Sequence, residues 1–228
     1  MIEIKNLTKQ FDGYYVLDDV SFKVKDAELV VILGPSGTGK TILLKSILRL
    51  VSVDQGAVYF DGKNILVLNN DEVYQIRKNV GFIFQSSALF DSMNVYENIA
   101  LPIIEHATIH SKEIRDKVKN LLQIVGLAGK EKLYPRALSG GMKRLVSIAR
   151  ALALSPKYLF YDEPTTGLDP VMRERIVNLI ISLKKEHQKS GIVVTHDLET
   201  AKAVGDEIYM LKDGKIKKLE RIEKGLYG

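Results

Sequence analysis

The sequence contains no cysteine, and aromatic residues make up only 7% of its 228 positions. The absence of cysteine excludes disulfides, thiolate metal sites and thiol catalysis, and it is compatible with a protein of the cytosol. No run of residues approaches the roughly 18 to 20 apolar positions that a membrane-spanning helix needs. The first residues, Met1–Lys5, carry charge where a secretory signal is apolar, so we expect a protein that is not exported.

Basic residues outnumber acidic ones, and the formal net charge is +5. Part of the excess lies between Lys112 and Lys132. The rest is concentrated near the C-terminus, at Lys212, Lys215, Lys217, Lys218, Arg221 and Lys224. Such charge is compatible with a solvated surface, with an anionic membrane face or with an acidic partner. The basic residues are not interleaved with aromatic side chains that stack on bases, so we expect no nucleic acid partner.

A glycine-rich segment near the N-terminus has the form G-x-x-x-x-G-K-[ST]. This segment, Gly34–Thr41, lies between an apolar run that predicts a buried strand (Leu29–Leu33) and an apolar helix (Ile42–Leu50). In this pattern the backbone N–H groups turn inward on a polyphosphate, the lysine reaches the terminal phosphates, and the hydroxyl binds Mg²⁺. The predicted nucleotide contacts are Gly34, Pro35, Ser36, Gly37, Thr38, Gly39, Lys40 and Thr41, and Thr41 is also a predicted metal ligand.

A second apolar run, Tyr158–Tyr161, ends in two adjacent carboxylates, Asp162 and Glu163. Two buried carboxylates are unfavourable unless a cation or hydrogen bonds compensate their charge. We expect Asp162 to hold Mg²⁺, directly or through water, and Glu163 to polarise the water that attacks the γ-phosphate. An acidic helix cap is the alternative interpretation.

The segment Leu138–Met142 reads Leu-Ser-Gly-Gly-Met and precedes a predicted helix. A serine hydroxyl, two glycines and a helix N-terminus form a second anion-binding shape. One triphosphate does not easily use two such cradles within one chain, whereas two copies of the chain can share them. Ser139, Gly140 and Gly141 are therefore predicted to contact the nucleotide of a partner copy, although a simple helix cap explains the segment alone.

The whole chain predicts an α/β fold, because short apolar runs alternate with amphipathic stretches. Ile192–Thr195 and Glu207–Leu211 are further predicted core strands. We also predict antiparallel strands in a β layer near the N-terminus, at Ile2–Leu7, Val16–Val24 and Ala57–Phe60, with turns at Asp12-Gly13 and Asp61-Gly62. Helices are predicted to begin at Ser111, after Leu138–Met142 and at Pro170. We predict a catalytic core with its β layer (1–84 and 157–228) and an inserted helical subdomain (85–156).

With these motifs in this order, the chain resembles the ATP-binding subunits of ATP-binding cassette (ABC) transporters over nearly its whole length. The resemblance implies a P-loop NTPase core of the RecA-like type and ATP hydrolysis with Mg²⁺. It also implies a head-to-tail dimer, in which two copies close over two ATP molecules, and a permease in the membrane as partner. The chain would then lie on the cytoplasmic face of the inner membrane.

The resemblance also assigns roles to four separate residues. Phe11, which lies 29 positions before Lys40, corresponds to the aromatic that stacks on adenine. Gln85 corresponds to the glutamine that contacts the metal and the attacking water. Asp169 falls in the family's dimer loop, and His196 corresponds to the histidine that contacts the γ-phosphate.

The chain departs from the family pattern at two positions. Ile42 replaces a common threonine whose hydroxyl meets the α-phosphate, so we expect one nucleotide contact at this position to be lost. Met142 replaces the usual glutamine after the two glycines. The phosphate contacts of this segment come from Ser139 and the glycines, so we expect Met142 to change affinity or coupling without abolishing them.

The stretch Gln85–His106 resembles the ATPases of bacterial Mla-type systems, which act in phospholipid trafficking with a permease and a lipid-binding MCE protein. Its apolar side chains either dock a helix of the permease or fill the core of the helical subdomain. They are Leu89, Phe90, Met93 and Val95.

Other functions are compatible with part of this pattern. Another ABC transport system, for lipoprotein release or small-molecule import, would use the same motifs. A DNA-repair ABC ATPase would have a long coiled-coil insertion, and a ribosomal one usually has two cassettes; neither is present. A monomeric P-loop kinase or GTPase would leave Leu138–Met142 unexplained, and the chain has no N-K-x-D segment.

Overall fold

The computed structural model describes residues 1–106 and 110–219. The chain divides into two compact units, one formed by residues 1–77 with the chain from residue 181 onward, and the other by residues 78–180. The predicted helical subdomain, 85–156, falls within the second unit, and its boundaries stay a prediction. Arg221 and Lys224 of the basic tail lie outside the described residues.

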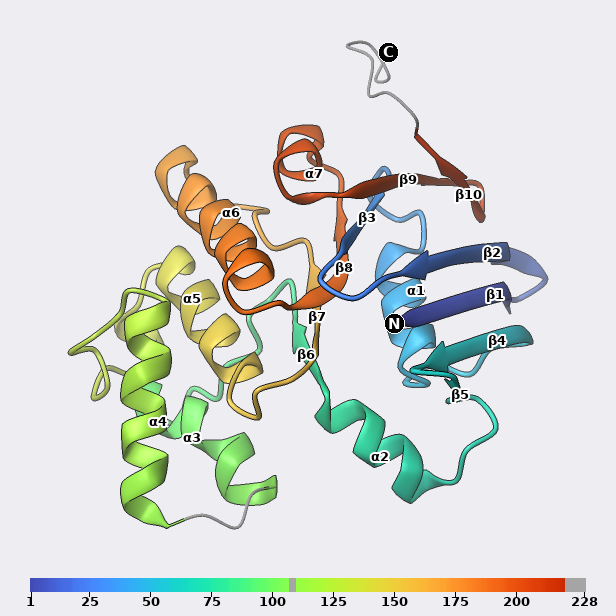
Figure 1. The fold of residues 1–228 in the computed structure, drawn as a ribbon. Helices are drawn as coiled ribbons and strands as arrows, with labels where there is room; N and C mark the ends of the chain where they lie inside the picture. The colour runs from blue at the N-terminus through green and yellow to red at the C-terminus, as the bar shows by residue number, and fades with distance from the viewer. Residues whose placement is uncertain (107–109, 220–228) are drawn as a thin grey trace. The chain divides into compact units, whose positions relative to one another are not determined.

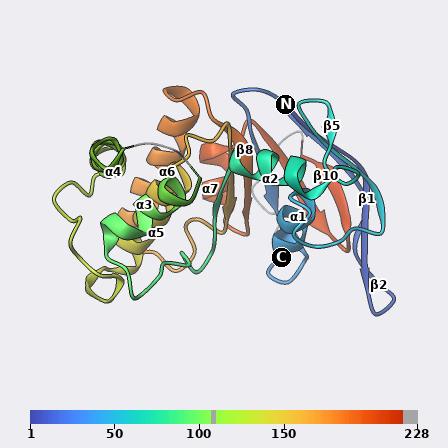
Figure 2. The ribbon, with the colours of Figure 1, turned by 90° about the horizontal axis from the view of Figure 1, so that it is seen from below.

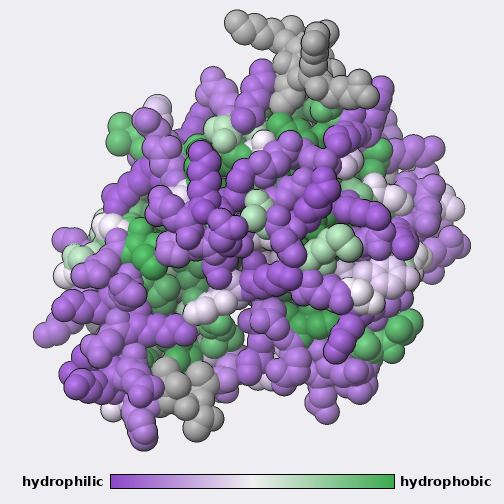
Figure 3. Space-filling view, in the orientation of Figure 1, coloured by the Kyte–Doolittle hydropathy of each residue, from purple (hydrophilic) through white to green (hydrophobic). Residues whose placement is uncertain are grey.

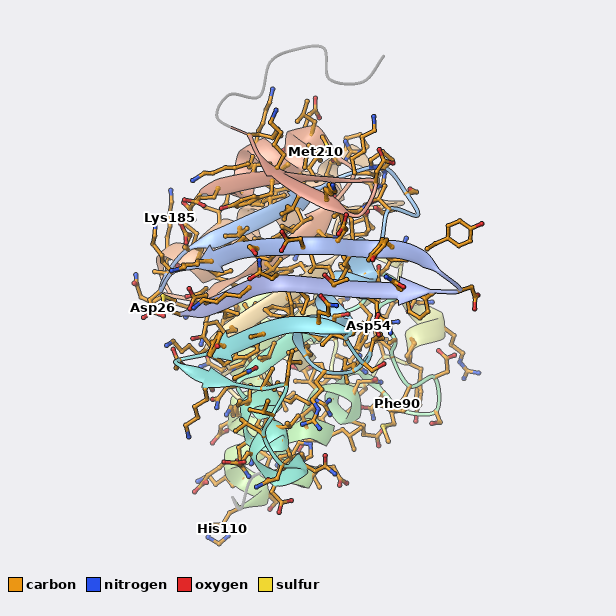
Figure 4. All side chains as sticks on the ribbon, turned by 90° about the vertical axis from the view of Figure 1, so that its right-hand side faces the viewer. Asp26, Asp54, Phe90, His110, Lys185 and Met210 are labelled. Carbon is orange, nitrogen blue, oxygen red and sulfur yellow. The ribbon has the colours of Figure 1, made fainter. Side chains whose placement is uncertain are left out.

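The first unit contains the predicted antiparallel β layer, with its strands in the order β2-β1-β4-β5 (Figures 1 and 4). A two-residue turn joins β1 to β2, and its residues Asp12 and Gly13 have φ angles of 50° and 83°. Positive φ at both positions matches the twist of the hairpin. The bounds are β1 Ile2–Phe11, β2 Tyr14–Val24, β4 Gln55–Phe60 and β5 Lys63–Asn64.

A second sheet of this unit has a parallel centre. Strand β3 pairs in parallel with both β8 and β9, and β9 pairs antiparallel with β10. Every residue of β3 and β8 is buried, as expected for strands covered on both faces. The helices α1 and α7 pack on these strands. The bounds are β3 Leu29–Leu33, β8 Ser190–Thr195, β9 Glu207–Lys212, β10 Lys215–Lys218, α1 Lys40–Ile47 and α7 Leu198–Val204.

In the second unit two parallel strands, β6 and β7, lie beside a group of helices (Figure 1), of which α3, α4 and α5 can also be followed in Figure 2. Helix α5 packs on β6, and α3 and α4 pack on α5 and on each other. Gly81 allows the close approach of β6 to α5, since a Cβ there would lie 2.6 Å from the carbonyl oxygen of Ala151. The bounds are β6 Val80–Ile83, β7 Tyr158–Asp162, α3 Val95–His106, α4 Ser111–Ile124 and α5 Gly140–Ala151. A short 3₁₀ helix, Pro135–Ala137, precedes α5, and α6 (Pro170–Lys185) begins in this unit.

Three α-helices of the described residues were not predicted from the sequence: α2 (Asn70–Lys78), α3 and α7. Helices α2 and α3 each begin with a reciprocal capping box. Asn69 and Glu72 exchange hydrogen bonds between side chain and backbone N–H before α2, and Asn94 and Glu97 do the same before α3. An Asn-x-x-Glu spacing was therefore the available signal for both helices.

The face of the molecule drawn in Figure 3 is mainly hydrophilic. On the face drawn in Figure 3, hydrophobic residues form small separate patches. Among the described residues, no helix combines the length and the apolar character that crossing a membrane requires.

Candidate functional site

The glycine-rich segment forms a loop between the buried strand β3 and helix α1 in the first unit. Lys40 is only 5% exposed, and its Nζ donates hydrogen bonds to the carbonyl oxygens of Gly34 (2.7 Å) and Pro35 (2.8 Å). The hydroxyl of Thr38 also donates to Pro35 O, at 2.9 Å. The loop is therefore folded around a buried ammonium group, which is a favourable arrangement for a polyphosphate.

The N-terminus of α1 is suited to an anion. Gly39 precedes it in a left-handed conformation (φ 93°), with no side chain capping the helix and no acidic residue in the first turn. The positive end of the helix dipole thus meets no carboxylate from the first turn of the helix itself. A side chain at Gly39 would be excluded, since its Cβ would lie 2.5 Å from Cγ1 of Val16.

His196 follows β8, the parallel neighbour of β3. The backbone N–H of Gly34 donates to the carbonyl oxygen of Thr195 at 3.2 Å, which ties the start of the loop to the residue before His196. The His196 side chain is exposed, and the next residue, Asp197, caps helix α7. Within this unit the structure therefore brings His196 and the glycine-rich loop to the same end of the parallel strands, where open α/β sheets bind ligands.

The predicted adenine-stacking residue, Phe11, ends β1 and is 44% exposed. The ammonium of Lys9 lies 4.9 Å from the centroid of its ring. Tyr14 and Tyr15 are more exposed, at 77% and 54%. All three aromatic side chains are thus accessible at this hairpin, and the choice of Phe11 stays a prediction.

In the second unit, β7 ends at the two predicted carboxylates. Asp162 and Glu163 are 3% and 6% exposed, and the backbone of Glu163 has a φ angle of 49°, which is uncommon for a residue other than glycine. The hydroxyl of Thr166 donates a hydrogen bond to Oε2 of Glu163 at 2.9 Å. This hydrogen bond orients the Glu163 carboxylate, and sequence reasoning did not identify Thr166.

Gln85 comes shortly after β6, and its side chain is exposed. Its backbone carbonyl accepts a hydrogen bond from Arg144 of α5, which also binds the carbonyl of Phe84. Burial lowers the pKa of the Arg144 guanidinium, and the nearby charge of Asp162 opposes this shift. Sequence reasoning did not identify Arg144 either. The helix was predicted from the motif before it, and nothing in the sequence indicated that Arg144 binds the carbonyl groups of Phe84 and Gln85.

The chemistry of the predicted metal ligands fits Mg²⁺. Thr41, Gln85 and Asp162 offer a hydroxyl, an amide and a carboxylate oxygen, the hard donors that this ion prefers. The described residues contain no group of three or more histidine and acidic side chains that would hold a metal by themselves. These ligands are therefore suited to an ion whose remaining ligands are phosphate oxygens and water.

Ser139 caps helix α5, because its Oγ accepts a hydrogen bond from the backbone N–H of Met142 at 3.2 Å. The helix-cap interpretation of this segment thus describes part of its structure. The two glycines differ: a Cβ at Gly140 would meet nothing within 4 Å, whereas a Cβ at Gly141 would lie 2.2 Å from Cγ of Met172. Asp169 caps α6 through a 2.9 Å hydrogen bond from the N–H of Met172.

The predicted site residues are divided between the two units. The first contains Phe11, the glycine-rich loop with Ile42, and His196. The second contains Gln85, Ser139 with its two glycines, Asp162, Glu163 and Asp169.

Comparisons with known proteins agree on the family. A family profile described as "ABC transporter" matches residues 17–166. The chain is 41% identical to the "Intermembrane phospholipid transport system ATP-binding protein MlaF" of Haemophilus influenzae, over 95% of this chain and 82% of that protein. It is 42% identical to the "Probable ribonucleotide transport ATP-binding protein mkl" of Mycobacterium leprae, over 92% of this chain, and it spans 60% of that relative's length.

A third relative is named for a different transport role. The "Methionine import ATP-binding protein MetN" of Clostridium tetani is 41% identical over 95% of this chain and 68% of its own length. Among solved structures, a dimeric ATP-binding cassette in a post-hydrolysis state, bound to ADP and Pi, matches with a TM-score of 0.87 and 35% identity. That match covers 97% of this chain and 100% of the solved chain.

Proposed function

Because the chain belongs to the ABC transporter family of ATP-binding proteins, we propose that it binds and hydrolyses ATP with Mg²⁺ to drive phospholipid transport through a membrane permease. The observation that carries the ATPase proposal is the loop around Lys40. The buried ammonium of Lys40 lies inside the glycine-rich loop. This loop leads directly into helix α1, whose N-terminus is not capped by a side chain. This combination is built for the terminal phosphates of a nucleotide.

Each residue has a defined part in the proposed reaction. Lys40 and the loop N–H groups bind the β- and γ-phosphates, and Phe11 stacks on adenine. Thr41, Asp162 and Gln85 would hold Mg²⁺, which would neutralise charge on the phosphates. Glu163 accepts a proton from the attacking water, and His196 contacts the γ-phosphate. Loss of the threonine hydroxyl at Ile42 removes one α-phosphate contact.

A second copy of the chain completes the proposed site. Ser139, Gly140 and Gly141 of one copy contact the ATP held by Lys40 of the other, and Asp169 lies in the dimer loop. This arrangement is supported by the solved relative, whose structure is of a dimer with ADP and Pi. Met142 leaves the serine and glycine contacts intact and alters affinity or coupling.

The permease is proposed to dock near the segment that follows Gln85, on the cytoplasmic face of the inner membrane. Phe90 is 49% exposed and is available for docking, whereas Val95 is 1% exposed and belongs to the core. Leu89 and Met93 are intermediate. Phospholipid as the cargo, with an MCE protein as a further partner, is supported by the MlaF relative and by the Gln85–His106 stretch.

A different transport system is the second candidate. It is favoured by one observation: the MetN and mkl relatives match this chain as well as MlaF does, at 41% and 42% identity. An ATPase of this family supplies energy to its permease, so its own residues do not identify the cargo.

The ATPase proposal is tested with Glu163→Gln and Lys40→Ala. Glu163→Gln should bind ATP, lose about 10²- to 10⁴-fold in turnover and accumulate closed dimers, because the carboxylate that accepts the proton is missing. Lys40→Ala should lose ATP binding or turnover. Glu113→Gln, on the exposed face of α4, is the matched control and should behave as wild type. Full turnover in Glu163→Gln would contradict the role of Glu163.

The cargo is tested by purifying the tagged chain from native membranes and identifying the proteins and lipids that come with it. A permease, an MCE protein and phospholipid would support the proposed function. A permease with a solute-binding protein would favour the second candidate, and a soluble partner on DNA or ribosomes would overturn transport.

A further inference from the structure

Two arginines of helix α5 hold the segment 84–90, which we call the Gln85 segment. Arg144 donates from NH1 to the carbonyl of Phe84 and from NH2 to that of Gln85. Six residues later in the same helix, Arg150 donates from NH2 to Ser87 O (3.1 Å) and from NH1 to Ala88 O (2.8 Å). Each guanidinium therefore spans two successive carbonyl groups, which uses its rigid fork.

The Gln85 segment needs these partners. Ser87 and Ala88 have φ angles of 62° and 45°, a left-handed conformation that is unfavourable for residues other than glycine unless the surroundings hold it. Their carbonyl oxygens are the two that Arg150 binds. The guanidinium of Arg150 also lies 6.0 Å from the centroid of the Phe90 ring.

Burial of the two arginine side chains is unfavourable by itself, because the guanidinium groups lose hydration. Arg144 is 4% exposed, and burial lowers the pKa of both guanidinium groups. A buried cation is tolerated only where its hydrogen bonds compensate the lost hydration. The carbonyl contacts of the Gln85 segment provide this compensation at NH1 and NH2 of each arginine, whereas Nε of Arg144 is buried without a hydrogen-bond partner among the described residues. Helix and segment therefore stabilise each other.

The other end of the segment is held by Asn98 of α3, which is fully buried. Its Oδ1 accepts from the N–H of Phe90 at 2.9 Å, and its Nδ2 lies within 3.1 Å of the carbonyl oxygens of Phe90, Met93 and Asn94. The backbone around Phe90 is therefore fixed, while its ring is half-exposed. This is the geometry of a rigidly presented contact residue.

We propose that Arg144 and Arg150 are positioning residues that join helix α5 and the Gln85 segment into one mechanical element. Ser139 caps one end of this helix, Gln85 is bound to it through Arg144, and the Phe90 ring lies 6.0 Å from the guanidinium of Arg150. A nucleotide contact at Ser139 therefore displaces Gln85 and Phe90 together with the helix, and a partner bound at Phe90 displaces Ser139 in return. This inference rests on the proposed function for what binds at the two ends.

The link is tested first without nucleotide, by hydrogen exchange of the full chain. Arg144→Lys and Arg150→Lys keep the charge but lose the fork that binds two carbonyls. Backbone amides of residues 85–90 should exchange about tenfold faster in either variant, while β7 keeps its wild-type protection. Arg115→Lys, on the exposed face of α4, is the matched control. Unchanged exchange at 85–90 in both arginine variants would overturn the link.

The second measurement adds ATP in the Glu163→Gln background, where turnover is blocked. In the Glu163→Gln chain, ATP should slow hydrogen exchange at residues 85–90. In the Glu163→Gln/Arg150→Lys chain, ATP should not slow exchange at these residues. The dissociation constant for ATP should be the same in both chains. Equal protection by ATP with and without Arg150→Lys would refute transmission through α5. If the Glu163→Gln chain binds no ATP, the proposed function fails, and the nucleotide-free comparison still decides the role of the arginines.

Discussion

Met172 lies directly against Gly141. A Cβ placed on Gly141 would be 2.2, 2.7 and 2.8 Å from Cγ, Sδ and Cε of Met172, whereas the same atom on Gly140 would meet nothing within 4 Å. Met172 is in the first turn of α6, whose cap is Asp169. A side chain at the second glycine of the Ser-Gly-Gly segment would therefore force the Met172 side chain of α6 to shift, whether or not a ligand is bound.

Gly141→Ala should consequently destabilise the protein by about 1 to 3 kcal/mol, the usual cost of overpacking. A thermal melt should show a decrease of roughly 2 to 4 °C per kcal/mol. Gly140→Ala should leave the melting temperature nearly unchanged. Gly141→Ala should lower the melting temperature less in a Met172→Ala background than in the wild-type protein, because the side chain with which the new methyl group clashes is then absent. Equal effects of the two alanine substitutions would contradict this account.

The hydrogen bond from Thr166 to Glu163 predicts a kinetic effect. Thr166→Val keeps the shape of the side chain but removes the donor, so the Glu163 carboxylate loses its orientation. We expect kcat to fall about three- to tenfold, the equivalent of one hydrogen bond, with ATP binding unchanged. Thr166→Ser should retain most of the turnover. Steady-state kinetics with an independent binding assay separate the two quantities, and a kcat of Thr166→Val equal to wild type would refute the role.

The hairpin of β9 and β10 should make stability depend on pH. A hydrogen bond from Lys218 lowers the pKa of Glu207 below its ordinary value, burial opposes this shift, and a hydrogen bond from Tyr209 adds to it. A depressed folded-state pKa stabilises the fold above the unfolded-state pKa, and this contribution is lost as pH falls through the folded-state value.

Glu207→Gln should therefore melt about 1 to 2 °C lower than wild type at pH 7, which corresponds to roughly 0.5 kcal/mol for a pair of this kind. The difference should shrink as the pH is lowered below the ordinary value of 4.5. Melting curves of both proteins across this pH range provide the measurement. A difference that grows toward low pH would have the wrong sign.

Ser46 of α1 is fully buried, and its hydroxyl has no hydrogen-bond partner among residues 1–106 and 110–219. Burying an unpaired hydroxyl costs about 1 to 3 kcal/mol, and alanine is also the better helix former. Ser46→Ala should raise the free energy of unfolding by about 1 kcal/mol in urea titrations. ATP binding should not change, since the N-terminus of α1 is untouched. Destabilisation would show that the hydroxyl has a partner, such as a buried water.

Phe90 predicts a separation of partner binding from catalysis. Phe90→Ala removes an aromatic ring that is 49% exposed, so the fold and the basal ATPase activity should persist. Co-sedimentation with washed membranes that retain the permease should fall several-fold. Val171→Ala, at a position 78% exposed on α6, controls for loss of an exposed apolar side chain. Equal sedimentation of both variants and wild type would exclude Phe90 from the docking surface.

The sequence by itself determined the local elements and the motifs that end them. The apolar run Leu29–Leu33 is β3, the periodic apolar residues after Ser111 are the buried face of α4, and Asp12-Gly13 is the predicted turn. These features depend on neighbours a few residues away, so periodicity and turn chemistry suffice to predict them. The order of the motifs was enough to identify the family.

Only the tertiary structure decided which side chains support those motifs. Arg144 and Arg150 bind carbonyl groups about 60 residues earlier in the chain, and Met172 packs on Gly141 from another helix. Likewise, Val95 is buried and Phe90 is exposed within one apolar stretch. A side chain's partner across such a separation depends on how whole elements pack, and neither the spacing nor the composition of the sequence contains that information.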